Sequence, residues 1–359
     1  MNNIFSIIKG TGSYIPSRNI ANEDFINNKF FFSDGRQYDT PITEIIENFH
    51  DITAIKERRY VSENINNSDI AYFAAKNALE TSGVDKETLD YIIVAHNFGD
   101  INSERNKIEL VPCLASKVKS KLGINNPYTV AYDITFGCPG WVLGLIQGNY
   151  YIKSGDAKRV LVIGAETMSR VLDPHDRDSM IFGDGAAAVI LEGIKSDEPI
   201  GIITHSMRTD SNECNNMIWM GYSYNPDYPR DKLFVKMNGK RVYQYAITHV
   251  PIALYECIRK AGLNFSDIKK LLIHQSNAKM DKAILERLCK LFFESNIPKD
   301  IMPMIISKLG NSSVATVPTL LDLIMKGELE NHSINSGDHI VLASVGVGMS
   351  INAIIYKMP

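Results

Sequence analysis

Short runs of apolar and β-branched residues alternate along the chain with stretches whose apolar residues recur at helical spacing. In the first half of the chain, five apolar runs predict strands, over 4–9, 91–96, 128–133, 159–164 and 186–191. The amphipathic stretches predict helices over 68–82, 111–122 and 138–153, and the glycines that end them are Gly83, Gly123 and Gly155. This alternation is typical of a layered α/β fold.

A second series of elements follows a loop rich in Pro, Asp and Asn at about 212–231. The pattern here predicts helices over 238–261, 279–293 and 314–326, and strands over 270–274, 339–344 and 350–356. The two series have a similar order without an obvious sequence repeat. We therefore predict a duplicated α/β architecture whose halves, 1–195 and 196–359, pack as one body, with reactive groups in loops that follow strands.

The composition excludes several classes of protein. The 359 residues include 41 acidic and 38 basic side chains, a formal charge of −3, so the chain lacks the general excess of positive charge that favours nucleic-acid binding. The five cysteines contain no C-x-x-C pair, which argues against both a disulfide framework and a zinc site. We therefore expect free thiols, no bound metal and no nucleic-acid partner.

No segment has the pattern of an export signal or a membrane span. The apolar stretch within 1–10 is too short for a signal-peptide core, and the most apolar segment, 340–356, is interrupted by serines, glycines and an asparagine. The glycine turns at 182–188 and 344–349 lack Rossmann or P-loop spacing. These features predict a cytoplasmic protein without a nucleotide cofactor.

Cys138 lies between a predicted strand and a predicted helix, within the sequence Asp-Ile-Thr-Phe-Gly-Cys-Pro-Gly-Trp at 133–141. Since Pro139 suits the first turn of a helix, we expect Cys138 at the N-cap, where the positive end of the helix dipole favours a nucleophilic thiolate. The alternative is a small buried hydrophobic residue, which is the usual state of a free cysteine. The local sequence leaves both interpretations open.

Two polar residues of the second half are further candidates for chemistry. His274 ends the apolar run before Gln-Ser-Asn, where a histidine can polarise a carbonyl or transfer a proton; the alternative is a core histidine held by backbone hydrogen bonds. Asn311 lies in a glycine-led turn that enters a helix, where it either caps the helix or donates its amide to a developing oxyanion.

The motifs occur in a specific order, namely Gly-Cys, Phe-Gly-Asp-Gly, His-Gln-x-Asn, Gly-Asn-x-Ser and a terminal G-x-G. In this order the chain resembles β-ketoacyl-acyl-carrier-protein synthase III, a family of thiolase-fold condensing enzymes, from the sequence Gly-Thr-Gly-Ser-Tyr-Ile-Pro at 10–16 to the final strand. The resemblance implies a thiolase-like, five-layered αβαβα sandwich built from two similar halves, and a homodimer.

The resemblance also implies a catalytic triad of Cys138, His274 and Asn311. Cys138 takes an acyl group from a thioester, and N–H groups at Cys138 and near Val347 stabilise the oxyanion. His274 and Asn311 bind the thioester oxygen of malonyl-acyl-carrier protein during a decarboxylative Claisen condensation. The implied activity is that of an acyltransferase of fatty-acid biosynthesis, which needs no metal or redox cofactor because phosphopantetheine arms carry the substrates.

Four residues are expected to contact substrate by the same resemblance. Arg177 matches the arginine that stacks on the adenine of coenzyme A, and Val111 matches an often aromatic residue that the partner subunit adds to the acyl pocket. Asn277 of the His-Gln-x-Asn motif and Gly346 of the terminal G-x-G complete this set. The smaller Val111 favours a longer or branched acyl group.

The chain departs from the family at the other half of the adenine clamp, where a Trp and an Arg are replaced by Asn48 and Ile52. This change favours acyl delivery by a carrier protein or by an acyl-coenzyme A other than acetyl-coenzyme A. It also favours a specialised lipid or polyketide-like pathway over housekeeping initiation.

A basic set on the predicted helix after His274 is either a docking site for acyl carrier protein or a solvated helix face; it comprises Lys279, Lys282, Arg287 and Lys290. Two other functions fit the same fold. One is acyl transfer to a hydroxyl or amine, or the joining of two acyl chains without malonate. The other is a non-catalytic scaffold, which the intact triad argues against.

Overall fold

Two β-sheets form the centre of the molecule, and the computed structural model describes residues 4–102 and 107–359. The larger sheet has the order β1 (Ile4–Tyr14), β9 (Asp184–Lys195), β8 (Arg159–Thr167), β4 (Tyr91–His96) and β7 (Val130–Thr135). The smaller sheet has the order β10 (Gly201–Thr209), β15 (Ser350–Lys357), β14 (His339–Gly346) and β13 (Ile268–Ile273). In the larger sheet, β4 pairs in parallel with β7 and β8, and β8 pairs antiparallel with β9. In the smaller sheet, β13 and β14 are parallel, and β14 and β15 are antiparallel.

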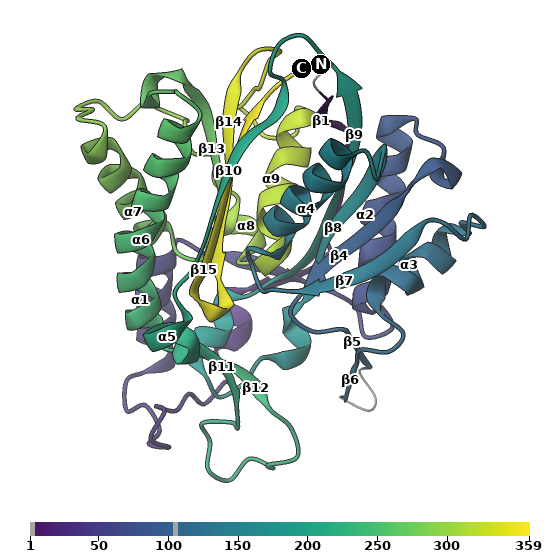
Figure 1. The fold of residues 1–359 in the computed structure, drawn as a ribbon. Coiled ribbons are helices and arrows are strands. Elements are labelled where there is room, and N and C mark those ends of the chain that lie inside the picture. The colour runs from purple at the N-terminus through teal and green to yellow at the C-terminus, as the bar shows by residue number, and fades with distance from the viewer. Residues whose placement is uncertain (1–3, 103–106) are drawn as a thin grey trace.

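Helices cover both faces of each sheet, so the elements form five layers (Figure 1). One outer layer contains α2 (Asn67–Ser82) and α3 (Leu114–Leu122), and the other contains α6 (Gly239–Lys260) and α7 (Ala278–Leu291). The layer between the sheets contains α4 (Gly140–Ser154) and α9 (Thr316–Met325). The predicted αβαβα layering is confirmed by these contacts.

Helix α2 illustrates how the sequence sets this packing. Its inward face is built from small side chains, and Ala71, Ala74, Ala75 and Ala78 are all fully buried against the larger sheet. Small side chains let a helix approach a sheet closely, so the helix and sheet exclude water without long apolar residues. An αL residue, Gly83 with φ +65°, then ends the helix as predicted.

Smaller elements surround the layers. They are β2 (Arg18–Ala21), β3 (Glu57–Tyr60), β5 (Asp100–Asn102), β6 (Lys107–Glu109), β11 (Ile218–Gly221), β12 (Phe234–Met237), α1 (Ile42–Thr53), α5 (Ser211–Cys214) and α8 (Ile306–Leu309). None of the helices in the described ranges combines the length and the hydropathy that crossing a bilayer requires.

Two helices begin later in the structure than predicted, and some elements, including helix α1, were not predicted. The helix predicted from 111 begins only at Leu114, because Cys113 precedes it in extended conformation as the N-cap residue. The helix predicted from 138 begins at Gly140. The pattern also gave no indication of strand β10, an edge strand whose outer residues alternate only weakly between apolar and polar. The boundary between halves at 195 stays a prediction.

Candidate active site

Cys138 lies in the turn between β7 and α4. Pro139, with φ −78° and ψ 2°, occupies the N-cap position of the helix, and Gly137 before it has φ +67°. The expectation of Cys138 at the N-cap is therefore wrong by one residue. A glycine turn from the last two strands presses against this segment, since a Cβ at Gly346 would lie 2.9 Å from the Cβ of Cys138. Only glycine fits at that contact.

His274 follows the last residue of β13 and continues its pairing with β14, because its backbone N–H donates to the carbonyl of Ala343 at 2.9 Å. The neighbouring Gln275 anchors the strand end, donating to the Pro303 carbonyl and accepting from the N–H groups of Ile305 and Ile306. Burial lowers the pKa of His274 to about 4, although the backbone of Ser313 partly opposes this. The imidazole is therefore neutral near pH 7 and has one N–H to donate.

Asn311 is fixed by its backbone on both sides. Its N–H donates to the carbonyl of Ile181, and its carbonyl accepts from the N–H of Gly183, both at 2.9 Å. Its side-chain Oδ1 accepts from the N–H of Ser313 at 2.8 Å, which is the capping interaction that the sequence suggested. Since Oδ1 serves the turn, the amide Nδ2 is the group that remains for a ligand.

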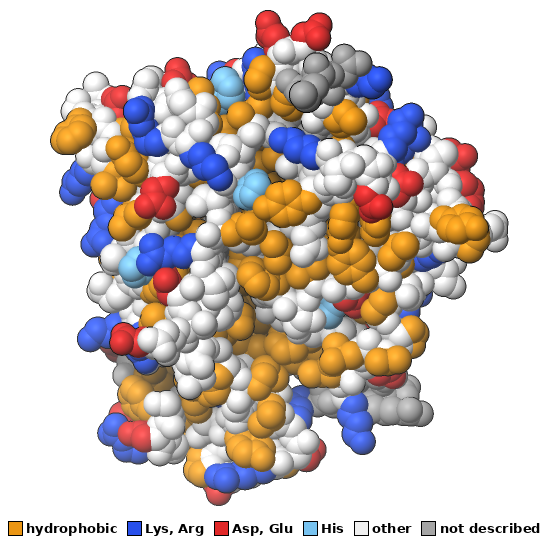
Figure 2. All heavy atoms as spheres, in the orientation of Figure 1, with side chains coloured by type: hydrophobic (Ala, Val, Ile, Leu, Met, Phe, Trp, Pro, Cys, Tyr) orange, Lys and Arg blue, Asp and Glu red, His pale blue; other side chains and the backbone are white. Residues whose placement is uncertain are grey.

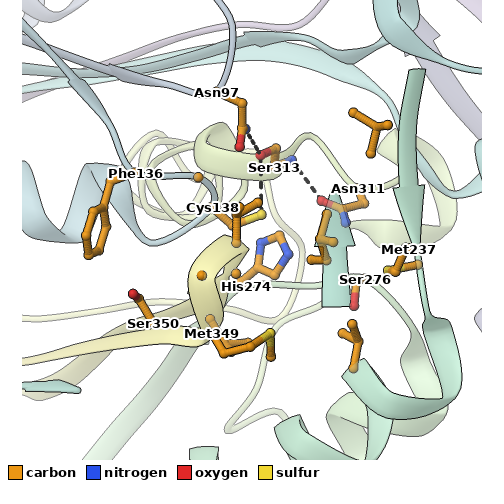
Figure 3. A pocket seen from close by; sticks show the side chains of 18 of the residues that line it. Asn97, Phe136, Cys138, Met237, His274, Ser276, Asn311, Ser313, Met349 and Ser350 are labelled. Atoms are coloured by element: carbon orange, nitrogen blue, oxygen red, sulfur yellow. Dashed lines mark hydrogen bonds between the residues drawn. The ribbon is translucent and has the colours of Figure 1, made fainter. Parts of the chain in front are cut away.

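One cavity of about 440 Å³ brings these three residues together from three separate elements (Figure 3). Cys138, His274 and Asn311 all line it, as do Gly346 and Val347 of the turn between β14 and β15. The remaining lining is mainly apolar and includes Phe98, Phe136, Met168, Ile218, Met220, Val235 and Met349. An apolar cavity with a few convergent polar groups is the usual form of a small-molecule site.

The surroundings of the thiol were not foreseen from the sequence. The sulfur of Cys138 lies 3.3 Å from Oγ of Ser313, which in turn contacts Nδ2 of Asn97 at 3.0 Å. Asn97 is bound to Glu166, a fully buried carboxyl. The only signal for Ser313 was its place in the Gly-Asn-x-Ser motif, and nothing marked Asn97 or Glu166.

Burial raises the pKa of the Cys138 thiol to about 11, and the nearby negative charge of Glu166 acts in the same direction. The hydrogen bond with Ser313 opposes both effects but does not cancel them. The predicted bias toward thiolate is therefore not present in the resting protein. Because the helix begins two residues later than Cys138, its terminal N–H groups do not compensate for the loss of water.

A second space, called the channel below, also has a volume of about 440 Å³ and shares part of its lining with the cavity. Met237, Val242, Ser276 and Met280 line both spaces, so the channel adjoins the cavity that contains Cys138. Arg177 and Asn277, two of the predicted substrate-binding residues, line the channel together with Asn48, Ile52, Gly239, Lys240 and Tyr243. The Arg177 guanidinium contacts Asp178 at 3.2 Å and lies over the ring of Tyr38.

Val111 lines neither space, because its side chain is 89% exposed at the surface of the chain. Two other exposed large apolar side chains are Tyr128, just before β7, and Val130 within it. Figure 2 shows hydrophobic side chains gathered across the middle of this face, on the β7 side of the larger sheet. Strand β7 is an edge strand, so among residues 4–102 and 107–359 no neighbouring strand pairs with its outer hydrogen-bonding groups.

The basic residues predicted on α7 are all exposed but differ in their contacts. Lys279 lies in the first turn, two residues after the channel residue Asn277, whose side chain caps the helix. Lys282 lies 3.9 Å from Glu286, and Arg287 donates to the carbonyl of Ile247. In the described ranges, no group of three or more His, Cys, Asp or Glu side chains is placed to hold a metal ion.

Comparisons with known proteins agree with the fold described above. Two family models match, one described as 3-oxoacyl-[acyl-carrier-protein] synthase III over residues 132–211, and the other as the C-terminal part of the same family over residues 258–358. Among curated proteins, β-ketoacyl-[acyl-carrier-protein] synthase III of Staphylococcus haemolyticus is 32% identical over 98% of each chain. The β-ketoacyl-[acyl-carrier-protein] synthase III 1 of Halalkalibacterium halodurans is 30% identical over 95% of each chain. The solved structure of the synthase III from Thermus thermophilus has a TM-score of 0.81 and 29% identity, and covers 98% of this chain and 99% of that one.

Proposed function

Because this chain belongs to the 3-oxoacyl-[acyl-carrier-protein] synthase III family of condensing acyltransferases, we propose that it extends an acyl group on Cys138 by decarboxylative condensation with malonyl-acyl-carrier protein. The observation that carries the assignment is the convergence of Cys138, His274 and Asn311 on one cavity. Nothing in the packing of the sheets requires a thiol, an imidazole and an amide at one point. Their combination supports two thioester reactions in sequence.

The first reaction transfers the acyl group to the protein. The sulfur of Cys138 attacks the thioester carbonyl, a carbon–sulfur bond forms, and the bond to the donor thiol breaks. In sum, the thiol proton of Cys138 passes to the departing thiol. The tetrahedral oxyanion needs donors on the side of the glycine turn, where the backbone nitrogen of Val347 lies close to Gly137. The N–H groups of Cys138 and Val347 are the proposed pair.

The second reaction uses the two residues of the C-terminal half. The neutral imidazole of His274 and the amide Nδ2 of Asn311 donate to the thioester oxygen of the malonyl group. Carbon dioxide leaves as its bond to the α-carbon breaks, and the resulting enolate carbon attacks the acyl carbonyl on Cys138. The carbon–sulfur bond then breaks, which releases the 3-oxoacyl product and restores the sulfur.

The entrance channel supports delivery by a phosphopantetheine arm. Arg177 and Asn277 both line it, and Asn277 uses Oδ1 for the cap of α7, which leaves its amide nitrogen for the arm. Half of the adenine clamp is absent, because Asn48 and Ile52 stand in the channel beside Arg177. Acyl carrier protein, or an acyl-coenzyme A with a larger acyl group than acetyl, is the proposed donor.

A homodimer is part of the proposal. The exposed edge strand β7 and the exposed Val111 are what a second copy would cover, with β7 pairing across the interface. Val111 would then reach the partner's acyl cavity. A valine there leaves more room than an aromatic ring, which fits a longer or branched acyl chain.

Mass spectrometry of the intact protein tests the proposal. The protein is incubated with a panel of acyl-coenzyme A and acyl-carrier-protein donors, and malonyl-acyl-carrier protein is added afterwards. We expect an acyl adduct that Cys138→Ala abolishes, followed by its discharge with release of carbon dioxide. The matched control is Cys214→Ala, a half-buried free cysteine that lines neither space and whose loss leaves the adduct intact.

Other outcomes identify the alternatives. Discharge of the adduct by alcohols or amines but not by malonyl-acyl-carrier protein would identify a transferase. Discharge by a second acyl thioester alone would identify an enzyme that joins two acyl chains. No adduct with any donor would contradict an enzymatic role for Cys138.

A further inference from the structure

The sulfur of Cys138 has a hydroxyl neighbour whose position is unusually constrained. Ser313 begins a short 3-10 helix with φ +54°, and its N–H is bound to Asn311 at 2.8 Å. These constraints place its Oγ 3.3 Å from the sulfur (Figure 3). A serine hydroxyl can accept or donate at such a contact, so its other partner decides which.

That other partner is Asn97, which follows β4. Its backbone N–H and its side-chain Nδ2 both donate to one oxygen of Glu166, at 2.7 and 2.5 Å. An ionised carboxylate only accepts hydrogen bonds, so it requires the nitrogen side of the amide. The second hydrogen of the same nitrogen points to Oγ of Ser313 at 3.0 Å.

The direction of the chain of hydrogen bonds follows from these roles. Because Ser313 Oγ accepts from Asn97, its single proton is left for the sulfur of Cys138. A hydrogen bond donated to an anion is stronger than one donated to a neutral group, so this arrangement favours the thiolate over the thiol.

We propose that Glu166, Asn97 and Ser313 are positioning residues that hold the Ser313 hydroxyl as a donor to the sulfur of Cys138 and so stabilise the attacking thiolate. This inference rests on the proposed function only in taking Cys138 as the nucleophile. It adds a task to three residues that line or support the cavity but belong to none of the steps above.

Glu166 has two opposite effects on the Cys138 thiolate, one through its charge and one through the hydrogen bonds that orient Ser313. Its negative charge raises the pKa of Cys138, whereas the hydrogen bond from Ser313 lowers it, and the hydrogen bond is the larger of the two. Burial raises the pKa of Glu166 to about 7, while nearby His96 and the backbone N–H groups of Asn97 and Phe98 lower it. His274 also faces the cavity but is neutral near pH 7. The carboxylate is ionised above about pH 7, where it enforces the direction of the chain.

The test is the pH dependence of Cys138 alkylation by iodoacetamide, followed by peptide mass mapping so that the other free cysteines do not interfere. No acyl donor is present, so the result is independent of whether the protein condenses acyl groups. For Ser313→Ala we expect the alkylation rate at about pH 8, where the Glu166 carboxylate is ionised, to fall at least about tenfold, the usual worth of a hydrogen bond to a charged group. The matched control is Ser312→Ala, because the neighbouring hydroxyl contacts Thr316 instead. A rate within twofold of this control would overturn the proposal.

A second variant tests the direction of the chain while keeping Ser313. In Asn97→Asp the new carboxyl oxygens accept from the Ser313 hydroxyl and draw its proton away from the sulfur. We expect a fall in alkylation close to that of Ser313→Ala, and no further fall in the double variant. An unchanged rate in folded Asn97→Asp would contradict the assigned direction. If Asn97→Asp does not fold, the comparison of Ser313→Ala with Ser312→Ala decides alone.

Discussion

The two ends of the substrate path are built differently. At the inner end, His274 and Asn311 are fixed by backbone hydrogen bonds to other segments, and Cys138 is enclosed by the glycine turn at Gly346. At the outer end, Arg177 is held by side-chain contacts with Asp178 and Tyr38, and Ile52 is 47% exposed. Backbone contacts between segments therefore fix the positions of the inner groups, whereas contacts between individual side chains fix the positions of the outer groups.

This difference separates the reaction from the choice of donor. A change at the inner end alters a group held by several backbone contacts and affects the chemistry directly. A change at the outer end leaves the chemistry in place and alters which thioester reaches it. Loops and exposed surfaces tolerate such changes more readily than buried segments do. The following predictions test whether the two ends are separable in this way.

The largest effect is expected at the inner end. His274→Ala and Asn311→Ala each remove one donor to the malonyl thioester oxygen, so condensation falls by about 10²–10³-fold. Acylation of Cys138 continues, because neither residue acts in that step. Separate assays of adduct formation and of carbon dioxide release distinguish the two reactions. Equal losses in both assays would show that these residues instead position Cys138.

Restoring the outer clamp tests the opposite end. Asn48→Trp combined with Ile52→Arg places an aromatic ring and a guanidinium beside Arg177, where they stack on adenine and bind phosphate. We expect KM for acyl-coenzyme A to fall about tenfold with an unchanged kcat, measured by steady-state kinetics. Asn48→Gln with Ile52→Leu, which adds neither an aromatic ring nor a charge, serves as the conservative control. A change in kcat without a change in KM would show that the two ends are coupled.

Carrier docking should depend on distance from the channel. Lys279→Glu reverses a charge next to Asn277, so we expect KM for the carrier protein to rise about three- to tenfold, and the rise to shrink at high salt. Lys290→Glu makes the same change about 16 Å further along α7 and is the control. Equal KM values for the two variants and the unmodified protein would contradict docking at this helix.

The smallest effect concerns pH. Burial holds the pKa of His274 at about 4, below the ordinary value of 6.5, so the imidazole stays neutral as the pH falls from 8 to 5.5. Decarboxylation of malonyl-acyl-carrier protein should therefore change less than twofold over this range, with loss only as the pH approaches 4. Rates are compared with those of His274→Gln, which has no titrating group. A decline with a midpoint near 6.5 would contradict the neutral buried imidazole.

Local patterns were sufficient to predict much of the fold. Strand β4 was predicted with the bounds observed, Tyr91–His96, because a buried strand in this position is a continuous apolar run. His274 was likewise expected at a strand end. Edge strand β10 was missed because most of its residues are only partly buried, and apolar and polar residues therefore alternate only weakly along it.

The missing parts of the site depend on contacts between distant segments. Asn97 and Ser313 are 216 positions apart, and no local pattern shows that their side chains meet. The predicted lowering of the Cys138 pKa was also wrong. The sequence indicates that a helix begins near Cys138, but it does not show the burial that raises the pKa of the thiol. Residue types were thus easier to predict than the electrostatic environment in which they act.

Strand β15 is the last element of the chain, yet it lies inside the smaller sheet, between β10 and β14. The turn that encloses Cys138 leads directly into this strand, and Asn352 on it donates to the carbonyl of Pro139. During synthesis, Cys138 emerges from the ribosome more than 200 residues before the strand that completes its pocket. The nascent chain therefore carries an unfinished thiol site, and a protein truncated before β15 lacks the enclosure that makes this cysteine different from the others.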